Sequence, residues 1–343
     1  MKYIFAFLLL LIFGCLPIQS QLRLKVVGDV MPGSYTPKPK MPADSGKAII
    51  KSVGDYLKNA DLTIGNFEGA FVKEGIQPNK CSDSLRKKNH CFEFGVPEEL
   101  AKMLPKIGFN AMTSDNNHCK DYGSSGYLNT HYVFDEIGIP LAGQRMPISL
   151  KIKNKKIALV AFGFDKNSFK ITNLDETSKV IQQLKKENDI VIVSFHGGAE
   201  GKKALYIADS TEYFLGGNRG NVIQFARTAI DAGADFVFGH SPHVLRAIEL
   251  YKGKLIAYSM GNFLTYGHFN LSGVNGVTAI LELSLDENNG NFLSGNIIPF
   301  KQKKPGIPYF DDKKEAIKLM QKLVSAYQNA NLTIDSNGEI IKK

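Results

Sequence analysis

The chain has 343 residues, of which 43% are hydrophobic, and a formal net charge of +9 at pH 7. This length suits one large domain or two small ones, and the apolar content excludes a mainly disordered chain. The lysines are spread along the sequence without a nucleic-acid-binding motif, so we expect no nucleic-acid partner. They form either solvated faces or a surface that attracts an anionic polymer.

Residues 1–20 have the pattern of an export signal. An apolar run over residues 3–13 follows a positive start and is too short for an ordinary membrane-spanning helix. Residues 12–15, IFGC, resemble a bacterial lipobox, which would place a lipid on Cys15; ordinary cleavage near Ser20 is the alternative. Both alternatives predict an exported protein. It is either a lipoprotein that contacts the membrane only through its anchor, or a periplasmic or extracellular protein.

The predicted export affects the interpretation of the cysteines. Cys81 and Cys91 flank a polar, lysine-rich loop, and an oxidising compartment favours a disulfide between them, which we predict. Cys119 is then left over beside His118. It is either a packed thiol, a thiol beside a metal ion, or an alternative disulfide partner.

The first half of the exported part alternates predicted strands with predicted helices. The strands are rich in Val, Leu and Ile, and the helices show apolar residues at helical spacing or end at a glycine. Predicted strands cover residues 22–28, 60–64, 109–113 and 139–142, and predicted helices cover residues 46–58, 97–107 and 126–137.

The second half adds strand pairs joined by hairpin turns. Predicted hairpins or strand pairs cover residues 148–162, 244–259 and 277–299, single strands cover 189–195 and 235–238, and helices cover 174–186, 218–232 and 311–327. The pattern predicts an α/β protein with a mixed sheet, or two sheets, packed between helices. We expect one domain over residues 21–330, followed by a loose polar tail over residues 331–343.

Polar side chains follow five of the predicted strands, at the point where each strand ends. They are Asp29, Asn66 with Glu68, Asn117 with His118, His196, and His240 with His243. Each has a simpler explanation as a turn, cap or surface residue. In open α/β sheets, however, ligands bind outside the carboxyl ends of the strands, so we expect these side chains to meet at one edge. Oxygen and imidazole donors without a firm cysteine ligand suit Mn, Fe or Zn, and two bridged ions are expected.

Six segments that contain these residues resemble, in order, the CapA family, which is associated with poly-γ-glutamate capsule synthesis. They are GDVMPG at 28–33, ADLTIGNFE at 60–68, NNH at 116–118 followed by DYG at 121–123, HGGAE at 196–200, GHSPH at 239–243 and YSMGNF at 258–263. The resemblance runs from about residue 22 to residue 300, which is nearly the whole exported part.

The CapA family is in turn similar to calcineurin-like metallophosphoesterases, which implies a four-layer sandwich: two mixed β-sheets flanked by helices. It also implies a site for two divalent ions. By this resemblance the first ion would be held by Asp29 and His243, the second by Asn117, His196 and His240, and Glu68 would bridge them. Met31 stands where phosphoesterases usually have a histidine, and the last histidine pair is spaced one residue wider, which leaves the first ion short of a ligand. Gly197 replaces a tryptophan, which is expected to open the pocket.

The same resemblance implies roles for the neighbouring residues. His118 would protonate the leaving group or hold an anion, Asp121 would orient His118, and Asn66 and Asn262 would contact substrate. The implied activity is hydrolysis of a phosphoester or γ-glutamyl-type bond in the cell envelope by metal-activated water. The alternative is a tethered, non-catalytic factor that binds an anionic envelope polymer during its assembly or retention.

Overall fold

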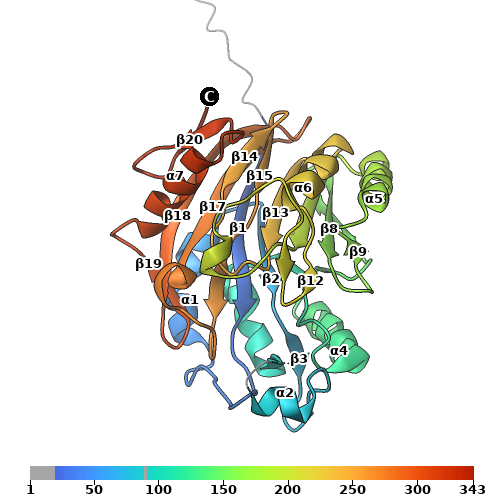
Figure 1. The fold of residues 1–343 in the computed structure, drawn as a ribbon, viewed down its shortest axis with the longest axis vertical. Coiled ribbons are helices and arrows are strands. Elements are labelled where there is room, and N and C mark those ends of the chain that lie inside the picture. Colours follow the sequence, from blue (N-terminus) through green and yellow to red (C-terminus); the bar gives the residue numbers. More distant parts are fainter. Residues whose placement is uncertain (1–19, 89–90) are drawn as a thin grey trace, which may run out of the picture.

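The computed structural model describes residues 20–88 and 91–343. The predicted export signal and Cys15 lie outside these residues, apart from Ser20. Two mixed β-sheets form the centre of the molecule (Figure 1). No helix in the described part of the chain is long and apolar enough to cross a membrane.

The first sheet has eight strands. Its order is β19 (Ile307–Phe310), β18 (Phe292–Lys303), β17 (Val277–Asp286), β1 (Gln21–Met31), β2 (Leu62–Phe67), β5 (Ala111–Ser114) and β6 (Leu141–Gly143), with β16 (Asn262–Thr265) also paired to β1. Strands β1, β2, β5 and β6 are parallel, whereas β17, β18 and β19 are joined antiparallel.

The second sheet has seven strands. Its order is β14 (Ile248–Tyr251), β15 (Lys254–Ala257), β13 (Phe236–His240), β10 (Ile190–His196), β8 (Lys155–Gly163) and β7 (Ile148–Ile152), with β9 (Phe169–Lys170) also paired to β8. Its central strands β8, β10, β13 and β15 are parallel, and antiparallel hairpins close both ends.

Alternating side chains divide the core into three layers of apolar contact. Val26 of β1 packs between the two sheets, whereas its neighbour Val27 packs against helices outside the first sheet. In the second sheet Ile192 of β10 faces the first sheet, and Val193 faces the outer helices. The order helix, sheet, sheet, helix confirms the predicted four-layer sandwich.

The outer helices supply the flanking layers. Helices α1 (Lys47–Leu57), α3 (Leu104–Ile107) and α4 (Gly123–Glu136) cover the first sheet, α5 (Leu174–Glu187) and α6 (Val222–Asp231) cover the second, and α7 (Glu315–Ala326) packs into the core between the sheets. Figure 1 shows α5 and α6 side by side on the outer face of the second sheet.

Short elements complete the described chain. They are β3 (Ala70–Val72), α2 (Asp83–Lys87), β4 (Gly95–Pro97), η1 (Glu98–Met103), η2 (Lys202–Ala204), β11 (Tyr213–Phe214), β12 (Gly217–Asn218), η3 (Gly273–Gly276), β20 (Leu332–Ile334) and β21 (Ile340–Lys342).

Three predicted elements differ from the structure. The helix predicted over residues 97–107 is a 3-10 helix followed by the short α3, because Pro105 cannot donate a backbone hydrogen bond within a continuous α-helix. The helix predicted from residue 218 begins only at Val222, where the Asn221 side chain caps it.

The prediction of a loose C-terminal tail was wrong. Residues 332–334 and 340–342 pair as the antiparallel strands β20 and β21. Leu332, Ile334 and Ile340 are buried in the core between the sheets, together with residues of α7. The tail is polar on average, but Leu332, Ile334 and Ile340 lie on its covered face, whereas Ile341 is exposed.

Candidate active site

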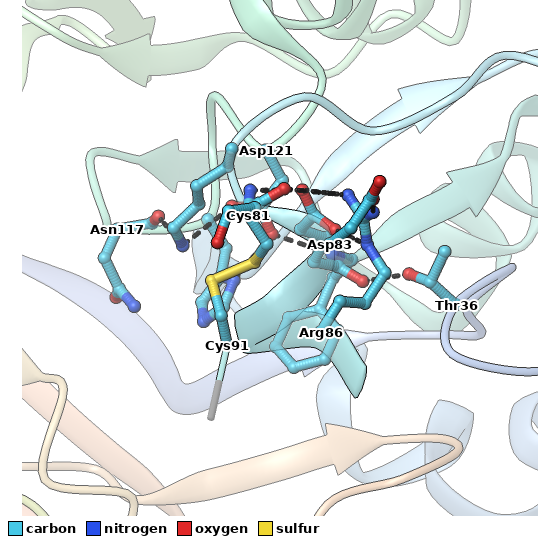
Figure 2. Close-up of a disulfide and its surroundings, with 12 residues drawn as sticks. Thr36, Cys81, Asp83, Arg86, Cys91, Asn117 and Asp121 are labelled. Atoms are coloured by element: carbon cyan, nitrogen blue, oxygen red, sulfur yellow. Dashed lines mark hydrogen bonds and ion pairs between the residues drawn. A yellow bond between two sulfur atoms is a disulfide. The ribbon is translucent and has the colours of Figure 1, made fainter. Parts of the chain in front are cut away.

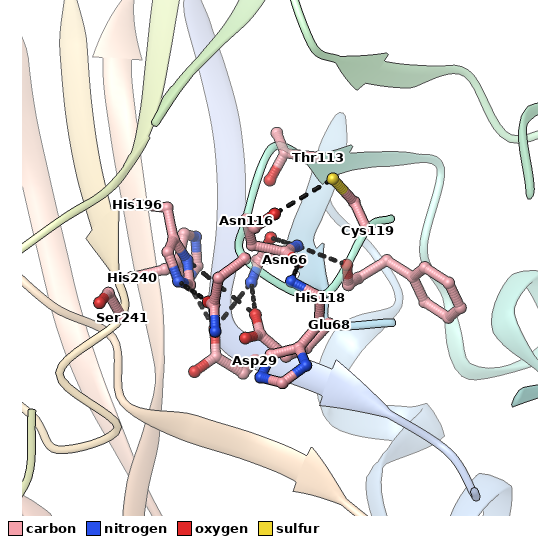
Figure 3. Close-up of polar contacts among 12 residues, drawn as sticks. Asp29, Asn66, Glu68, Thr113, Asn116, His118, Cys119, His196, His240 and Ser241 are labelled. Atoms are coloured by element: carbon pink, nitrogen blue, oxygen red, sulfur yellow. Dashed lines mark hydrogen bonds and ion pairs between the residues drawn. The ribbon is translucent and has the colours of Figure 1, made fainter. Parts of the chain in front are cut away.

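The polar residues predicted at five strand ends lie together, where the carboxyl ends of the two parallel sets of strands meet (Figure 3). Asp29 in β1 is the register partner of Asn66 in β2 and of Asn262 in β16. His196 and His240 are register partners at the ends of β10 and β13. The parallel pairing of neighbouring strands therefore delivers the side chains to one place.

Backbone features shape this edge. A Cβ atom on Gly28 would lie 1.8 Å from the carbonyl oxygen of Gly261, so glycine is required for residues 260–262 to approach β1. This approach allows the Asp29 amide to donate to the Gly261 oxygen at 2.9 Å. In the turn after β13, Ser241 and His243 both have positive φ, at 98° and 55°, a conformation that is uncommon for residues with a side chain.

The Asp29 carboxylate lies at the centre of the site and is completely buried. Its Oδ1 accepts from Asn66 Nδ2 at 2.9 Å and lies 3.3 Å from His240 Nδ1, and its Oδ2 lies 2.9 Å from His243 Nδ1. Burial opposes ionisation, but the imidazoles of His240 and His243 outweigh it and hold the pKa of Asp29 well below its ordinary value. Asp29 is therefore a carboxylate at neutral pH.

Glu68 is buried beside Asp29, but its pKa is shifted in the opposite direction. Its Oε2 accepts from Asn66 Nδ2 and lies 4.0 Å from His196 Nδ1. Its Oε1 has no hydrogen-bond partner among the described residues. Burial and the charge of Asp29 raise the pKa of Glu68 well above its ordinary value. The Glu68 carboxyl group therefore favours its protonated form more than an ordinary glutamate does.

Two histidines have buried nitrogens that are not hydrogen-bonded. His196 Nε2 lies 2.8 Å from Asn117 Oδ1, but its Nδ1 has no hydrogen-bond partner in residues 20–88 and 91–343. Both nitrogens of His240 also lack a well-aligned hydrogen bond, although Nδ1 lies 3.3 Å from Asp29 Oδ1. Burial lowers the pKa of His196 well below its ordinary value, so its ring is neutral. Buried polar atoms are normally hydrogen-bonded, so these imidazole nitrogens are candidates for binding a ligand.

His243 is held differently. Its Nδ1 lies 2.9 Å from Asp29 Oδ2 and 3.0 Å from Asn262 Oδ1. Burial acts to lower the pKa of His243, but the hydrogen bond to Asp29 and the surrounding carboxylates raise it to about 9. His243 is therefore an imidazolium paired with Asp29, and it must lose a proton before it can bind a metal.

His118 and Asp121 form the pair that the sequence predicted. His118 Nδ1 lies 2.6 Å from Asp121 Oδ2, which also accepts from the Phe94 amide, and Lys80 Nζ lies 2.8 Å from Asp121 Oδ1. Burial lowers the pKa of His118 and outweighs the charge of Asp121. With its Nδ1 proton donated to Asp121, the neutral ring has Nε2 as an acceptor.

The predicted Cys81–Cys91 disulfide is present and supports this pair (Figure 2). Arg86 and the Cys81 amide both bond Glu93, at 3.0 and 2.7 Å. Glu93 precedes Phe94, whose ring lies 4.2 Å from the His118 ring. Lys80, Glu93 and Phe94 therefore brace the His118–Asp121 pair.

Cys119 is a free, buried thiol. Its Sγ lies 3.1 Å from the Asn116 carbonyl oxygen and accepts from Gln144 Nε2 at 3.4 Å. Of the three interpretations of this residue, the structure supports a packed thiol.

Asn66 and Asn262, predicted as substrate contacts, are both buried and already hydrogen-bonded within the site. Asn66 joins Asp29 to Glu68 and accepts from Asn116 Nδ2 at 3.0 Å. Sequence reasoning gave Asn116 no role, although it lies in the same strand-end segment as Asn117.

Arg219 and Glu200 are further neighbours that sequence reasoning missed. Arg219 Nη2 lies 3.3 Å from Glu200 Oε1, and Glu200 Oε2 lies 4.0 Å from His243 Nε2. Glu200 ends the HGGAE segment, so that motif could have indicated it. Arg219 follows no predicted strand, and nothing in its local sequence points to the site.

The expectation that Gly197 opens the pocket was wrong. A Cβ at this position would lie 2.2 Å from Ile171 Cδ1 and 3.0 Å from the Arg219 carbonyl oxygen. The space beside Gly197 is therefore filled by the protein itself, and the glycine allows the backbone of Arg219 to come close.

In the described part of the chain, no group of three or more His, Cys, Asp or Glu side chains is arranged to hold a metal ion as it stands. Asp29 is instead hydrogen-bonded to Asn66 and His243. Binding an ion would require these contacts to be exchanged for contacts with the ion.

A family described as "Bacterial capsule synthesis protein PGA_cap" matches residues 23–266 of this chain. The chain belongs to this family. The resemblance to CapA is thereby confirmed, and the matched span includes the site residues from Asp29 to Asn262.

Two relatives and one solved structure are similar to this chain over different shares of its length. The PGA biosynthesis protein CapA of Bacillus subtilis is 30% identical over 263 residues, which are 71% of this chain and 63% of that protein. The capsule biosynthesis protein CapA of Bacillus anthracis is 26% identical over 266 residues, which are 71% of this chain and 60% of that protein. The PGA_cap chain therefore spans about six-tenths of the length of these relatives. A putative 5'-nucleotidase from Staphylococcus aureus, solved with alpha-ketoglutarate, aligns with 89% of this chain and 58% of its own, with 14% identity and a TM-score of 0.47.

Proposed function

We propose that this PGA_cap protein is a metal-dependent hydrolase of the cell envelope that cuts a phosphoester or γ-glutamyl-type bond. The observation that carries the proposal is the set of buried, unpaired donor atoms at the strand ends. Within the described residues, Glu68 Oε1, His196 Nδ1 and both nitrogens of His240 are buried without a hydrogen bond, beside the ionised Asp29. Leaving such atoms unpaired costs about 1–3 kcal/mol each, which a bound cation would relieve.

The chemistry of these donors fits divalent metal ions. Carboxylate, amide oxygen and neutral imidazole are the ligands that Mn, Fe and Zn share, and Glu68, whose ionisation is opposed by Asp29, would be ionised beside a cation. The residues that would hold two ions are Asp29, Glu68, Asn117, His196, His240 and His243. Bound ions would supply Lewis acidity and a nucleophile at neutral pH.

The protein's own residues would do the rest of the chemistry. Asp121 fixes the tautomer of His118, so that Nε2 is the atom that accepts or delivers a proton or contacts an anion. Asn66 holds Asp29 and Glu68 in place, and Asn262 holds His243. Export as a lipoprotein on Cys15, or by ordinary cleavage near Ser20, would put this site in contact with envelope polymers.

Replacing His240 with Ala tests the proposal. We expect purified full-length protein to bind Mn, Fe or Zn and to hydrolyse bis(p-nitrophenyl) phosphate or poly-γ-glutamate. Because removing a residue that merely supports a metal ligand costs about 10–100-fold, losing a ligand should lower activity by at least about 100-fold. Elemental analysis measures the metal content of each protein, and initial rates measure its hydrolytic activity.

His131 provides a matched control. It lies on α4 with an unpaired buried Nε2, its ring is 4.7 Å from the Tyr127 ring, and the carboxylate that acts on it is Asp135 of the same helix rather than Asp29. His131→Ala should keep the metal content and activity of the parent protein. Equal metal content and equal rates in the parent and in His240→Ala would contradict the proposal.

A second function is supported by the net charge of +9. The protein would then bind an anionic envelope polymer without cutting it. If the parent protein binds poly-γ-glutamate but hydrolyses neither substrate, this second function is supported.

A further inference from the structure

We infer that Arg219 recognises an oxyanion of the ligand at this site, and that Glu200 occupies the place of that oxyanion in the free protein. The inference names the ligand chemistry of the site in the proposed function, but it does not depend on hydrolysis. Its basis is the difference between two arginine–glutamate pairs that involve one segment, residues 199–220, which we call the strap: Arg219–Glu200 within it, and Glu212 with Arg246, which lies outside it.

The backbone of Arg219 is fixed next to the site. Its carbonyl oxygen accepts from the Gly198 amide at 2.8 Å, two residues beyond His196, and its own amide donates to the Glu212 carbonyl oxygen at 2.8 Å. Because Gly197 leaves no side chain in between, this part of the strap lies directly against the end of β10.

The guanidinium of Arg219 is largely buried but poorly hydrogen-bonded. It stacks on the Phe164 ring at 4.0 Å, and its side chain is 10% exposed. Its polar contacts are long, at 3.3 Å to Glu200 Oε1 and 3.4 Å to Ser241 Oγ. A guanidinium has five N–H donors and holds its charge at any ordinary pH, so most of its capacity to bind an anion is unused by these contacts.

Glu200 lies between Arg219 and His243. One of its oxygens is 3.3 Å from Arg219 Nη2, and the other is 4.0 Å from His243 Nε2. Both contacts are longer than a strong charge-assisted hydrogen bond, and the Glu200 side chain is 20% exposed. A tetrahedral or planar oxyanion could displace this carboxylate and contact the Arg219 guanidinium.

The pair between Glu212 of the strap and Arg246 outside it shows what a purely structural arginine looks like. Arg246 has no exposed side-chain surface, and its two terminal nitrogens bond both oxygens of Glu212 at 2.8 and 2.7 Å. It also donates to the Ala199 carbonyl oxygen at 3.1 Å. The short contacts between Arg246 and Glu212 therefore hold the strap in place. The longer contact between Arg219 and Glu200 could be exchanged for contact with a ligand.

The test measures binding of two probes, inorganic phosphate and glutarate, to the full chain by isothermal titration calorimetry. A hydrogen-bonded charge pair of this kind corresponds to about 10–100-fold in affinity, so Arg219→Gln should weaken the preferred probe by that factor and Arg219→Lys by less. Glu200→Gln should strengthen binding several-fold, because it removes the competing charge. The probe that binds more tightly assigns the oxyanion to a phosphoryl or a carboxylate group.

Arg227 is the matched control. It also pairs with a glutamate, Glu249, at 2.7 Å and lies over an aromatic ring, Tyr251, but both partners are outside the site. Arg227→Gln should leave the affinity for both probes unchanged. Thermal melting of each variant checks that it is folded, and Glu200→Gln still tests the inference if Arg219→Gln does not fold.

Three results would overturn the inference: no binding of either probe by the parent protein, equal affinity in the parent and in Arg219→Gln, or weaker binding in Glu200→Gln. The last is what a structural role for the pair predicts. A parent protein that binds phosphate or glutarate through Arg219 but hydrolyses nothing would refute the hydrolase proposal alone.

Discussion

Asp29 determines the charge state of the residues around it. Its ionised carboxylate raises the pKa of His243 to about 9 and also raises the pKa of Glu68. The same side chain is hydrogen-bonded by Asn66. One fully buried negative charge is thus compensated by the His243 imidazolium, and it opposes ionisation of the second carboxyl group, as expected for charges in a low-dielectric interior.

Two neighbouring isoleucines test the C-terminal hairpin at the level of single residues. Ile340 is 4% exposed and packs between the sheets, whereas Ile341 is 46% exposed. Ile340→Ala should lower the free energy of unfolding by about 2–5 kcal/mol, because it leaves a cavity in the core. Ile341→Ala should change it by no more than about 0.5 kcal/mol.

Urea unfolding of the two variants gives the comparison. Similar small losses for both would mean that the hairpin contributes little to the core, as the sequence suggested.

The site residues that could be predicted combine a side chain able to bind a metal with a position at the end of an apolar strand. His196 and His240 are imidazoles at the ends of strongly apolar strands, and both reach the site. Arg219 could not be predicted, because its contacts Phe164 and Ser241 come from distant segments of the chain. The charge of His243 was also beyond prediction, since it depends on the pairing with Asp29.

At the scale of elements, the Cys81–Cys91 disulfide is the main constraint on the loop beside His118. It closes a loop of sequence separation 10 that contains α2. In the loop-entropy account, its removal should lower the free energy of unfolding by about 2–3 kcal/mol. A Cys81→Ala/Cys91→Ala variant compared with the oxidised parent in urea measures this loss.

A reducing agent separates this effect from other changes. It should lower the unfolding midpoint of the parent and leave the double variant unchanged, because the remaining described cysteine, Cys119, is a buried free thiol. An unchanged parent midpoint on complete reduction would contradict the prediction.

Elements were predictable where the hydrophobic pattern was long and simple. The helix predicted over residues 174–186 is α5 at Leu174–Glu187, and the strand predicted over 189–195 is β10. Short elements such as β16 and β20 were missed because three or four residues carry too little periodicity. Their positions are set by partners that are distant in sequence.

At the scale of the whole molecule, Asp61 and Lys153 join the two sheets at the edge opposite the site. Lys153, in the turn between β7 and β8, bonds Asp61 Oδ2 and the Gln21 carbonyl oxygen, each at 2.8 Å. Burial opposes ionisation of Asp61, but Lys153 and the Arg23 amide outweigh it and lower its pKa. The folded state therefore favours the ionised carboxylate.

The sign of the pH dependence follows from this lowered pKa. The pair stabilises the fold above the ordinary carboxyl pKa, and its contribution disappears as the pH falls below about 4. Since Lys153 is 45% exposed, the contribution is about 1 kcal/mol or less. Asp61→Asn should lower the free energy of unfolding at pH 7, and the gap from the parent should narrow between pH 4 and pH 3.

Asp231→Asn is the control for this measurement, because its ion pair with Lys252 is exposed on both sides. It should have an effect close to zero at every pH. A gap for Asp61→Asn that stays constant from pH 7 to pH 3 would show that the charge is not the cause.

The four-layer arrangement was predictable only through the family resemblance. The alternation of strands and helices indicates an α/β protein, but it leaves one mixed sheet or two as alternatives. The choice depends on β1, whose neighbours β2 and β17 lie far apart in sequence, and no local pattern records that pairing.

The central place of β1 has a consequence for how the chain is made. One edge of β1 pairs with β2, but its other edge pairs with β16 and β17, more than 200 residues later. During synthesis, which proceeds from the N-terminus, that edge has no strand to pair with until residues 262–286 emerge. Open strand edges pair readily with other chains, so we expect aggregation to be the main hazard of incomplete chains. The earliest strand to appear is among the last to find its complete set of neighbours.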